Sequence, residues 1–166
     1  VIRGSGMASD VNTNFTSING ALYNFNGTNL IECPPGISGN FSVADGTITV
    51  EYRAFVTCSA LTSITIPDSV TTIGQDAFVL CGSLNTINIG TGVGSIGPGW
   101  LAYCGSITAF NVAEGNTNYS SIDGVLYNEG ATTLIQYPVY KSGNFTVPST
   151  VTTIDNGALT YCTNLY

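Results

Sequence analysis

The sequence predicts an α/β, β-rich solenoid in which short coils stack along one axis and share a parallel β-ladder of about five strands. Apolar residues and cysteines recur every 23 residues, and two longer segments align with each other at an offset of 104 residues. The end of each unit also alternates apolar and polar residues. A repeat period of roughly 20–29 residues with Leu or Ile at fixed offsets is typical of a solenoid. The sequence therefore determines architecture much better than activity.

The 23-residue period runs through three short units, 47–69, 70–92 and 93–115. In the second of them, an extended piece ending at Ile73-Gly74 leads into Ala77-Phe78-x-x-Cys81, which has helix-like spacing. The unit then closes with Ile87-x-Ile89, and this period-two alternation predicts a strand with one buried face.

Two long units of 35 residues, 12–46 and 116–150, align with each other without a gap. In each, two apolar segments flank a turn signal, and this pattern predicts a β-hairpin. The turn signals are Asn26-Gly27 and Glu129-Gly130.

Each long unit then rejoins the common ladder, through Phe41-Ser42-Val43 in the first and Phe145-Thr146-Val147 in the second. Together with the three short units, these segments make about five ladder strands. Residues 151–166 form a partial unit, whereas 1–11 lie outside the repeat register and resemble a linker or a tag. We therefore expect one repeat domain over 12–166.

Five cysteines are an odd number, which excludes complete internal pairing. Four of them, Cys58, Cys81, Cys104 and Cys162, occupy the same repeat position. The simplest interpretation is a column of small buried hydrophobic residues. Disulfides between stacked neighbours stay open as an alternative, and they would need Cα atoms within about 7 Å in a suitable orientation.

Composition disfavours several classes of partner. Apolar residues make up 43% of the chain but charged residues only 8%, where about 25% is usual. The net charge of −7 opposes binding to nucleic acid and to anionic lipid surfaces. Since no apolar run approaches the roughly 18 residues of a membrane span, we expect no direct membrane insertion.

Catalysis finds little support in the residue inventory. The chain has no histidine, so Ser-His and Cys-His nucleophile systems and His metal ligands are absent. Gly92, Gly94 and Gly97 match G-x-G-x-x-G, yet Val93 and Ile96 between them occupy core positions of the repeat, and no long helix can follow within the unit. We expect no enzymatic activity, no cofactor and no metal site.

The repeat V-x-x-I-G-x-x-A-F-x-x-C-x-S-L-x-x-I-x-I, as it stands from Val70 to Ile89, resembles the BspA-like leucine-rich repeat. The long unit, with Tyr119 to Tyr127 and Tyr137-Pro138, resembles the longer variant coil of that family. Trp100-Leu101 departs from the expected Ala-Phe pair in the third short unit. The family occurs in surface proteins of bacteria and of mucosal protist parasites. The resemblance implies a non-enzymatic extracellular or cell-surface protein that adheres to other proteins, to host surfaces or to its own kind.

The polar residues between the buried positions of each ladder strand are the candidate binding site, because successive side chains point to opposite faces. They are Asn40, Ser42, Ser63, Thr65, Thr86, Asn88, Asn111, Asn144 and Thr146. We expect this face to bind a protein or glycan on a host or neighbouring cell. The alternative is a structural surface protein whose open solenoid ends stack into filaments or layers.

Overall fold

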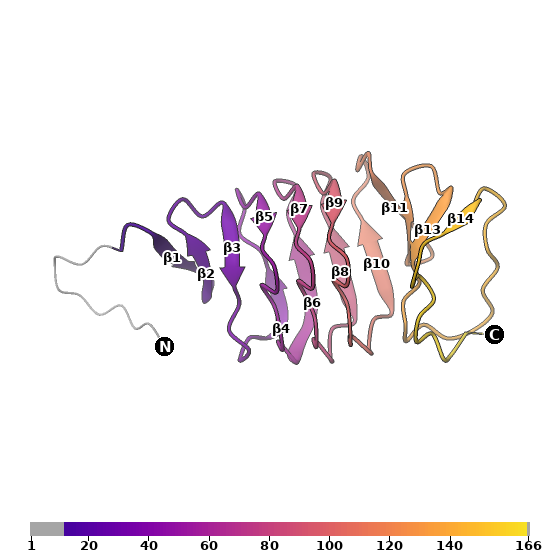
Figure 1. Cartoon of the computed structure of the whole chain (residues 1–166), viewed down its shortest axis with the longest axis horizontal. Coiled ribbons are helices and arrows are strands. Elements are labelled where there is room, and N and C mark those ends of the chain that lie inside the picture. Colours follow the sequence, from indigo (N-terminus) through magenta and orange to yellow (C-terminus); the bar gives the residue numbers. More distant parts are fainter. Residues whose placement is uncertain (1–11, 166) are drawn as a thin grey trace.

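The computed structural model describes residues 12–165, so the expected lead-in 1–11 lies outside the described residues. The predicted solenoid is confirmed: coils stack side by side along one long axis (Figure 1). Within the described part of the chain, no helix is long and apolar enough to cross a membrane.

The main ladder is a four-stranded parallel sheet in which strands from successive units lie next to each other (Figure 1). Its strands, in chain order, are β4 (Ser38–Ser42), β6 (Ala60–Ile66), β8 (Thr86–Ile89) and β10 (Ala109–Val112). The 23-residue step sets the register, because Ile64 pairs with Ile87 and Ile87 with Phe110. Strict alternation keeps these side chains buried, as the sequence predicted.

A second ladder runs along the other side of the coils (Figure 1). Its parallel strands come from the extended piece that starts each short unit and, in the first long unit, from the segment after the hairpin turn. They are β3 (Asn29–Glu32), β5 (Thr49–Val50), β7 (Thr72–Ile73) and β9 (Ser95–Ile96). In the C-terminal part, β13 (Thr133–Gln136) pairs in the same way with β14 (Thr153–Ile154).

Each long unit adds antiparallel strands: the first extends the second ladder, whereas the second forms a separate four-stranded sheet with β13 and β14. The first contributes β1 (Phe15–Ile18) and β2 (Ala21–Asn24), and the second β11 (Tyr119–Ile122) and β12 (Val125–Asn128). The predicted hairpins at Asn26-Gly27 and Glu129-Gly130 are confirmed as the β2–β3 and β12–β13 connections.

The structure adds a second hairpin turn to each long unit, at Asn19-Gly20 and Asp123-Gly124. All four of these residues have positive φ, between 51° and 82°. Two-residue hairpin loops favour this geometry because it matches the twist of the flanking strands.

The helix-like spacing around Phe78 was misleading, since this segment forms successive turns and no helix is assigned within 12–165. The amide of Phe78 donates to the carbonyl oxygen of Trp100 in the next coil, at 2.8 Å, and the amide of Phe55 likewise donates to Ala77. Left-handed residues such as Asp76 (φ 54°) and Leu80 (φ 64°) interrupt any helical path. Hydrogen bonding between coils therefore replaces hydrogen bonding along a helix.

The fifth ladder strand, expected at 145–147, does not form. The only β-pairing described in this region is an isolated parallel bridge between Gly143 and Leu165. The edge of β10 is covered instead by the hairpin β11–β12, because the amide of Phe110 donates to the carbonyl oxygen of Gly124 at 2.9 Å.

The core is correspondingly divided into two clusters. The larger one extends from the first long unit through β10 to Leu126 in β12, and it contains an aromatic row in which the Phe55 and Phe78 rings stack with centroids 5.0 Å apart. The smaller cluster, around Tyr127, Leu134 and Tyr137, lies in the C-terminal part. The regular stacking of the main ladder thus ends at β10.

Candidate binding surface on the strand face

Seven of the nine candidate residues form two polar columns on the outer face of the main ladder. The first column consists of Asn40, Ser63 and Thr86, and the second of Ser42, Thr65, Asn88 and Asn111. Neighbours within a column are direct partners in the strand register. All seven are exposed or half-buried, because they alternate with side chains that point into the core, such as Ile64 and Ile87.

Side-chain hydrogen bonds link the second column. Asn111 Nδ2 donates to Asn88 Oδ1 at 2.9 Å, and Asn88 Nδ2 donates to Thr65 Oγ1 at 3.3 Å. Asn88 Nδ2 also lies 3.3 Å from the carbonyl oxygen of Ile64. These bonds hold three side chains in fixed orientations and so reduce the conformational entropy that a ligand would have to remove.

Side chains of the first column bond to residues outside it. Thr62 Oγ1 lies 3.4 Å from Asn40 Oδ1, and Thr86 Oγ1 donates to Asn85 Oδ1 at 2.9 Å. The two columns therefore differ, and the second is the better organised.

Asn144 and Thr146 do not belong to this surface. Both are exposed, but neither lies in a strand, so placing them on the ladder was wrong. The hairpin of the second long unit already occupies the edge of β10, where Ser121 Oγ also donates to the Phe110 carbonyl oxygen at 2.6 Å.

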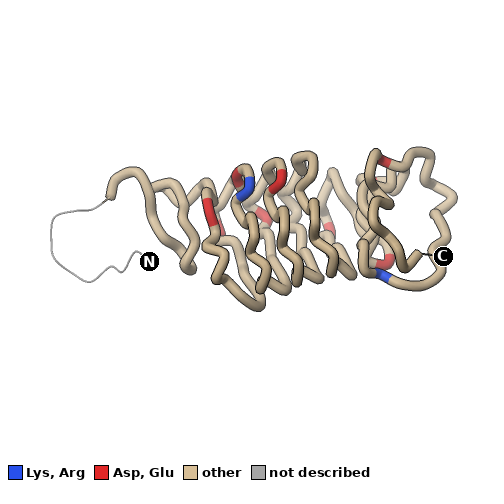
Figure 2. Tube along the Cα trace, turned by 60° about the horizontal axis from the view of Figure 1, so that its bottom comes forward, with Lys and Arg blue, Asp and Glu red and all other residues tan. Residues whose placement is uncertain are grey.

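A shallow hollow of about 490 Å³ lies where the second column meets the ends of the ladder strands. Thr65, Asn88 and Asn111 line it, and so do Asp45 and Asp68. No Lys or Arg is among its lining residues, and Figure 2 shows how few charged positions the described tube carries. The hollow therefore offers hydroxyl and amide groups and two carboxylates, beside apolar residues such as Ile66, Pro67 and Val112.

Sequence reasoning missed Asp45 and Asp68, although a signal was present. They are 23 residues apart, directly after consecutive ladder strands, and Glu114 falls two further steps along the same position. Asp68 Oδ1 accepts a hydrogen bond from the Thr91 amide at 2.7 Å.

The glycines of the G-x-G-x-x-G match serve coil packing. A Cβ at Gly92 would collide with the carbonyl oxygen of Asp68, and one at Gly97 with the backbone of Gln75. These glycines let neighbouring coils approach closely, which explains the pattern without a bound phosphate.

All five cysteines are free thiols, and Cys33, Cys58, Cys81 and Cys104 are buried. The interpretation of the repeating cysteines as small buried residues is confirmed for three of the four, while Cys162 is half-buried. The residues described by the structure contain no group of three or more His, Cys, Asp and Glu side chains that could hold a metal ion.

Solved structures of several bacterial leucine-rich repeat proteins are similar to this fold. PcpA, a pneumococcal vaccine antigen, has a TM-score of 0.59 at 22% identity, over 83% of this chain and 44% of PcpA. TpLRR, a leucine-rich repeat protein of T. pallidum, has a TM-score of 0.57 at 19% identity, over 92% of this chain and 66% of TpLRR.

A leucine-rich repeat protein from Eubacterium ventriosum has a TM-score of 0.50 at 24% identity, over 76% of this chain and 46% of that protein. The chain thus spans between 44% and 66% of the length of these three proteins. At these identities the likeness concerns the fold.

No curated protein is significantly similar to the chain in sequence. The model of the BspA type leucine-rich repeat region, in six copies, matches residues 37–166, which is more than half of the chain. Neither this family nor the similar structures are described as enzymes. The chain belongs to the BspA-type leucine-rich repeat family.

Proposed function

We propose that this chain is a non-enzymatic adhesion module at the cell surface or outside the cell, which binds a protein ligand through the second polar column and the hollow beside it. The observation that carries the proposal is the hydrogen-bonded row Thr65–Asn88–Asn111, which presents ordered amide and hydroxyl groups across three neighbouring coils. Ordered polar groups on a rigid scaffold lose little conformational entropy on binding.

The ligand surface that fits best is polar and carries basic groups. Asp45 and Asp68 line the hollow without a Lys or Arg beside them, and the chain as a whole has a net charge of −7. Opposite charge on a partner would speed its approach and fix its orientation. The surface location is supported by the family and by the description of PcpA as a vaccine antigen.

A microarray of recombinant extracellular protein domains tests the proposal. Any domain that binds the wild-type chain is measured again with Asn88→Arg, which places a bulky cation in the centre of the column. We expect its Kd to rise at least about tenfold, as for a central interface residue. Ser59→Arg, at an exposed turn residue outside the ladder face, is the matched control and leaves the Kd unchanged.

Equal binding by Asn88→Arg and the wild type would exclude the strand face as the site. Negative-stain imaging of the same samples separates adhesion from self-assembly. Monomeric particles agree with the proposal, whereas long fibres formed equally by both variants would favour end-to-end stacking.

A further inference from the structure

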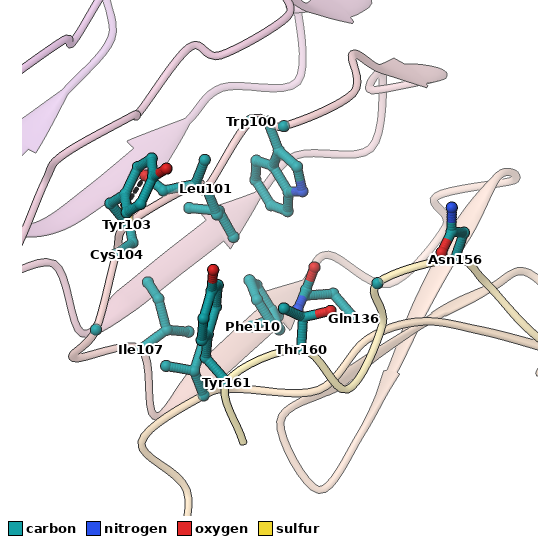
Figure 3. Close-up of a pocket in the computed structure, with 15 residues that line it drawn as sticks. Trp100, Leu101, Tyr103, Cys104, Ile107, Phe110, Gln136, Asn156, Thr160 and Tyr161 are labelled. Atoms are coloured by element: carbon teal, nitrogen blue, oxygen red, sulfur yellow. Dashed lines mark hydrogen bonds between the residues drawn. The ribbon is translucent and has the colours of Figure 1, made fainter. Parts of the chain in front are cut away.

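A second hollow, the junction cleft, lies between the two core clusters (Figure 3). It has a volume of about 570 Å³. One wall is the turn segment 99–105, the other is the segment 156–161, and Ile107, Phe110 and Gln136 lie between them. No residue that lines the junction cleft also lines the hollow on the strand face.

The junction cleft arises because hydrogen bonding between the turn segments of neighbouring coils stops at the third short unit. In the preceding coils, amides at every second turn residue donate to the next coil: Phe55 to Ala77 at 2.8 Å, and Thr57 to Val79 at 3.0 Å. The same pattern repeats one coil later, as Leu80 donates to Ala102 at 3.0 Å.

The next three amides in this pattern belong to Gly99, Leu101 and Tyr103. Among residues 12–165, no acceptor is found for any of them. The second long unit attaches elsewhere, because the amide of Tyr140 donates to the Ile107 carbonyl oxygen at 2.9 Å. The wall 99–105 therefore carries a row of backbone donors on the side where the next coil would lie.

Aromatic rings stand on both walls. Tyr103 is 69% exposed and Tyr161 is 72% exposed, and both have the left-handed conformation of the same repeat position. Figure 3 shows Trp100, Leu101 and Tyr103 on one wall and Tyr161 on the other, with the Tyr161 hydroxyl directed into the space between them. Exposed aromatic rings on facing walls offer flat apolar surfaces against which a ligand can pack.

The polar lining residues are uncharged. They are Gln136, Asn156 and Thr160, and no Asp, Glu, Lys or Arg lines the cleft. Gln136 Nε2 donates to the carbonyl oxygens of Tyr137 and Ala158, which fixes the orientation of its side chain and of Oε1. A ligand here would meet amide and hydroxyl groups, backbone donors and aromatic rings.

From these features we infer that the junction cleft binds a neutral saccharide of two or three sugar units. Sugar hydroxyls can accept from the amides of the 99–105 wall, and the apolar face of a sugar ring can lie against Tyr103 or Tyr161. An uncharged lining selects against anionic and cationic ligands. The volume lies within the roughly 300–1,000 Å³ of small-molecule sites. A peptide is the alternative that the test has to separate, because chain carbonyl oxygens accept from the equivalent amides in the preceding coils.

Intrinsic fluorescence provides a direct test, because Trp100 is the single tryptophan of the chain and lines the junction cleft. The probes are neutral trisaccharides of glucose, of galactose and of N-acetylglucosamine, each titrated into the whole chain. At least one is expected to shift the Trp100 emission with saturation.

Variants then locate the bound sugar. Tyr161→Ala and Tyr103→Ala are expected to raise the Kd of that trisaccharide at least about tenfold. Tyr161→Phe keeps the ring and should bind within about threefold of the wild type if stacking dominates. Tyr52→Ala removes a tyrosine that is 55% exposed and does not line the cleft, so it serves as the matched control. Thermal unfolding of each variant checks that the fold is kept.

Two results would overturn the inference. One is the absence of any saturable fluorescence change with all three trisaccharides. The other is binding that Tyr161→Ala, Tyr103→Ala and Tyr52→Ala leave equally intact. A peptide that shifts Trp100 emission at lower concentration than every sugar would replace the saccharide by a peptide ligand. Because the strand-face variant Asn88→Arg should not alter sugar binding, failure at one site is distinguishable from failure at the other.

Discussion

The Cys81 thiol donates a hydrogen bond to the carbonyl oxygen of Phe55 in the preceding coil, with Sγ 3.0 Å from that oxygen. One coil further along, Cys104 Sγ lies 2.9 Å from the carbonyl oxygen of Phe78. The neighbouring Cys104 thiol and burial both raise the pKa of Cys81. Cys81 thus links two coils as a protonated donor, and it fills a small space in the core like the other buried cysteines of its repeat position.

The thiols should differ sharply in their reactivity. Cys33, Cys58, Cys81 and Cys104 are at most 2% exposed, whereas Cys162 is half-buried. We expect an aromatic disulfide reagent to modify Cys162 first and the other four only on unfolding, because the reactive thiolate requires access to water. The released chromophore, followed with and without denaturant, measures this. Rapid modification of two or more thiols in the native protein would contradict it, as would a melting temperature lowered by a reducing agent.

The glycines between coils predict a sharp contrast between two alanine variants. Gly92→Ala should destabilise the chain by more than about 2 kcal/mol, because its Cβ would meet the Asp68 carbonyl oxygen and force two coils apart. Gly82→Ala is the matched control, since nothing lies within 4 Å of a Cβ there and its φ is not in the left-handed region. This control should be neutral or stabilising by up to about 1 kcal/mol.

Urea unfolding of both variants measures the difference between them. Equal stability of Gly92→Ala and Gly82→Ala would mean that neighbouring coils are not in close backbone contact at Gly92.

The repeat made the ladder register predictable. The apolar residues recur every 23 residues, so each strand residue lies next to the equivalent residue of the next coil. The pairs Ile64–Ile87 and Thr65–Asn88 show this register. Period-two alternation then determines which side chains face water. Seven of the nine candidate residues follow from these two rules alone.

The path of the second long unit could not be predicted in the same way. Phe145-Thr146-Val147 has the same apolar-polar-apolar pattern as Phe41-Ser42-Val43. However, only the earlier segment contributes to a ladder strand. The two segments compete for the edge of β10. The Asp123-Gly124 hairpin occupies that edge, because the Phe110 amide donates a hydrogen bond to the Gly124 carbonyl oxygen. Competition between backbone segments that are distant in the sequence leaves no local sequence signal. The junction cleft could not be predicted for the same reason, because it forms where the regular stacking ends.

The turn segments show a second limit. Leu80 and Tyr103 have positive φ, at 64° and 61°, although neither is a residue that favours this region. For Leu80, a hydrogen bond from its amide to Ala102 in the next coil holds this conformation, and a single coil read in isolation gives helix-like spacing instead. The local residue pattern therefore gave a wrong prediction in the segments whose backbone conformation depends on hydrogen bonds between coils.

The start of the second long unit depends on a buried asparagine. Asn116 is 7% exposed, and its Nδ2 donates to the carbonyl oxygens of Gly90 at 2.8 Å and Val93 at 3.1 Å. Its Oδ1 accepts from the amides of Asn118 and Tyr119, both at 2.8 Å. Asn116→Asp replaces both donors with an oxygen that faces two carbonyl groups. We expect a loss of at least about 3 kcal/mol in the free energy of unfolding at pH 7.

The first long unit provides the control for this variant. Asn12 occupies the same repeat position, and its Oδ1 accepts from Asn14 at 2.8 Å and Phe15 at 3.1 Å. Asn12 is exposed, so Asn12→Asp keeps the acceptor in water and should cost less than about 0.5 kcal/mol. Guanidinium unfolding measures the loss of unfolding free energy in both variants. Similar losses in Asn116→Asp and Asn12→Asp would show that the Asn116 donors do not stabilise the junction.

Alkaline pH should destabilise the fold through its buried tyrosines. Burial raises the pKa of Tyr23, Tyr119, Tyr127 and Tyr137 above the ordinary value of 10.0, and for Tyr127 the charge of Asp123 acts in the same direction. The unfolded chain then loses these protons at lower pH than the folded chain does. The stability they contribute is complete below about pH 10 and is lost as the pH rises through the folded-state values, at up to about 1.4 kcal/mol per pH unit for each group.

Tyr127→Phe isolates one of these groups. Urea unfolding between about pH 8 and pH 11 should show a shallower alkaline decline for Tyr127→Phe than for the wild type, because one proton is no longer released on unfolding. Tyr140→Phe, at a residue that is 60% exposed, should follow the wild-type curve. Tyrosinate absorbance of the native chain provides an independent check, since part of the signal should appear only as the protein unfolds. If Tyr127→Phe and the wild type lost stability with the same slope, the Tyr127 hydroxyl would not be held in a buried, protonated state.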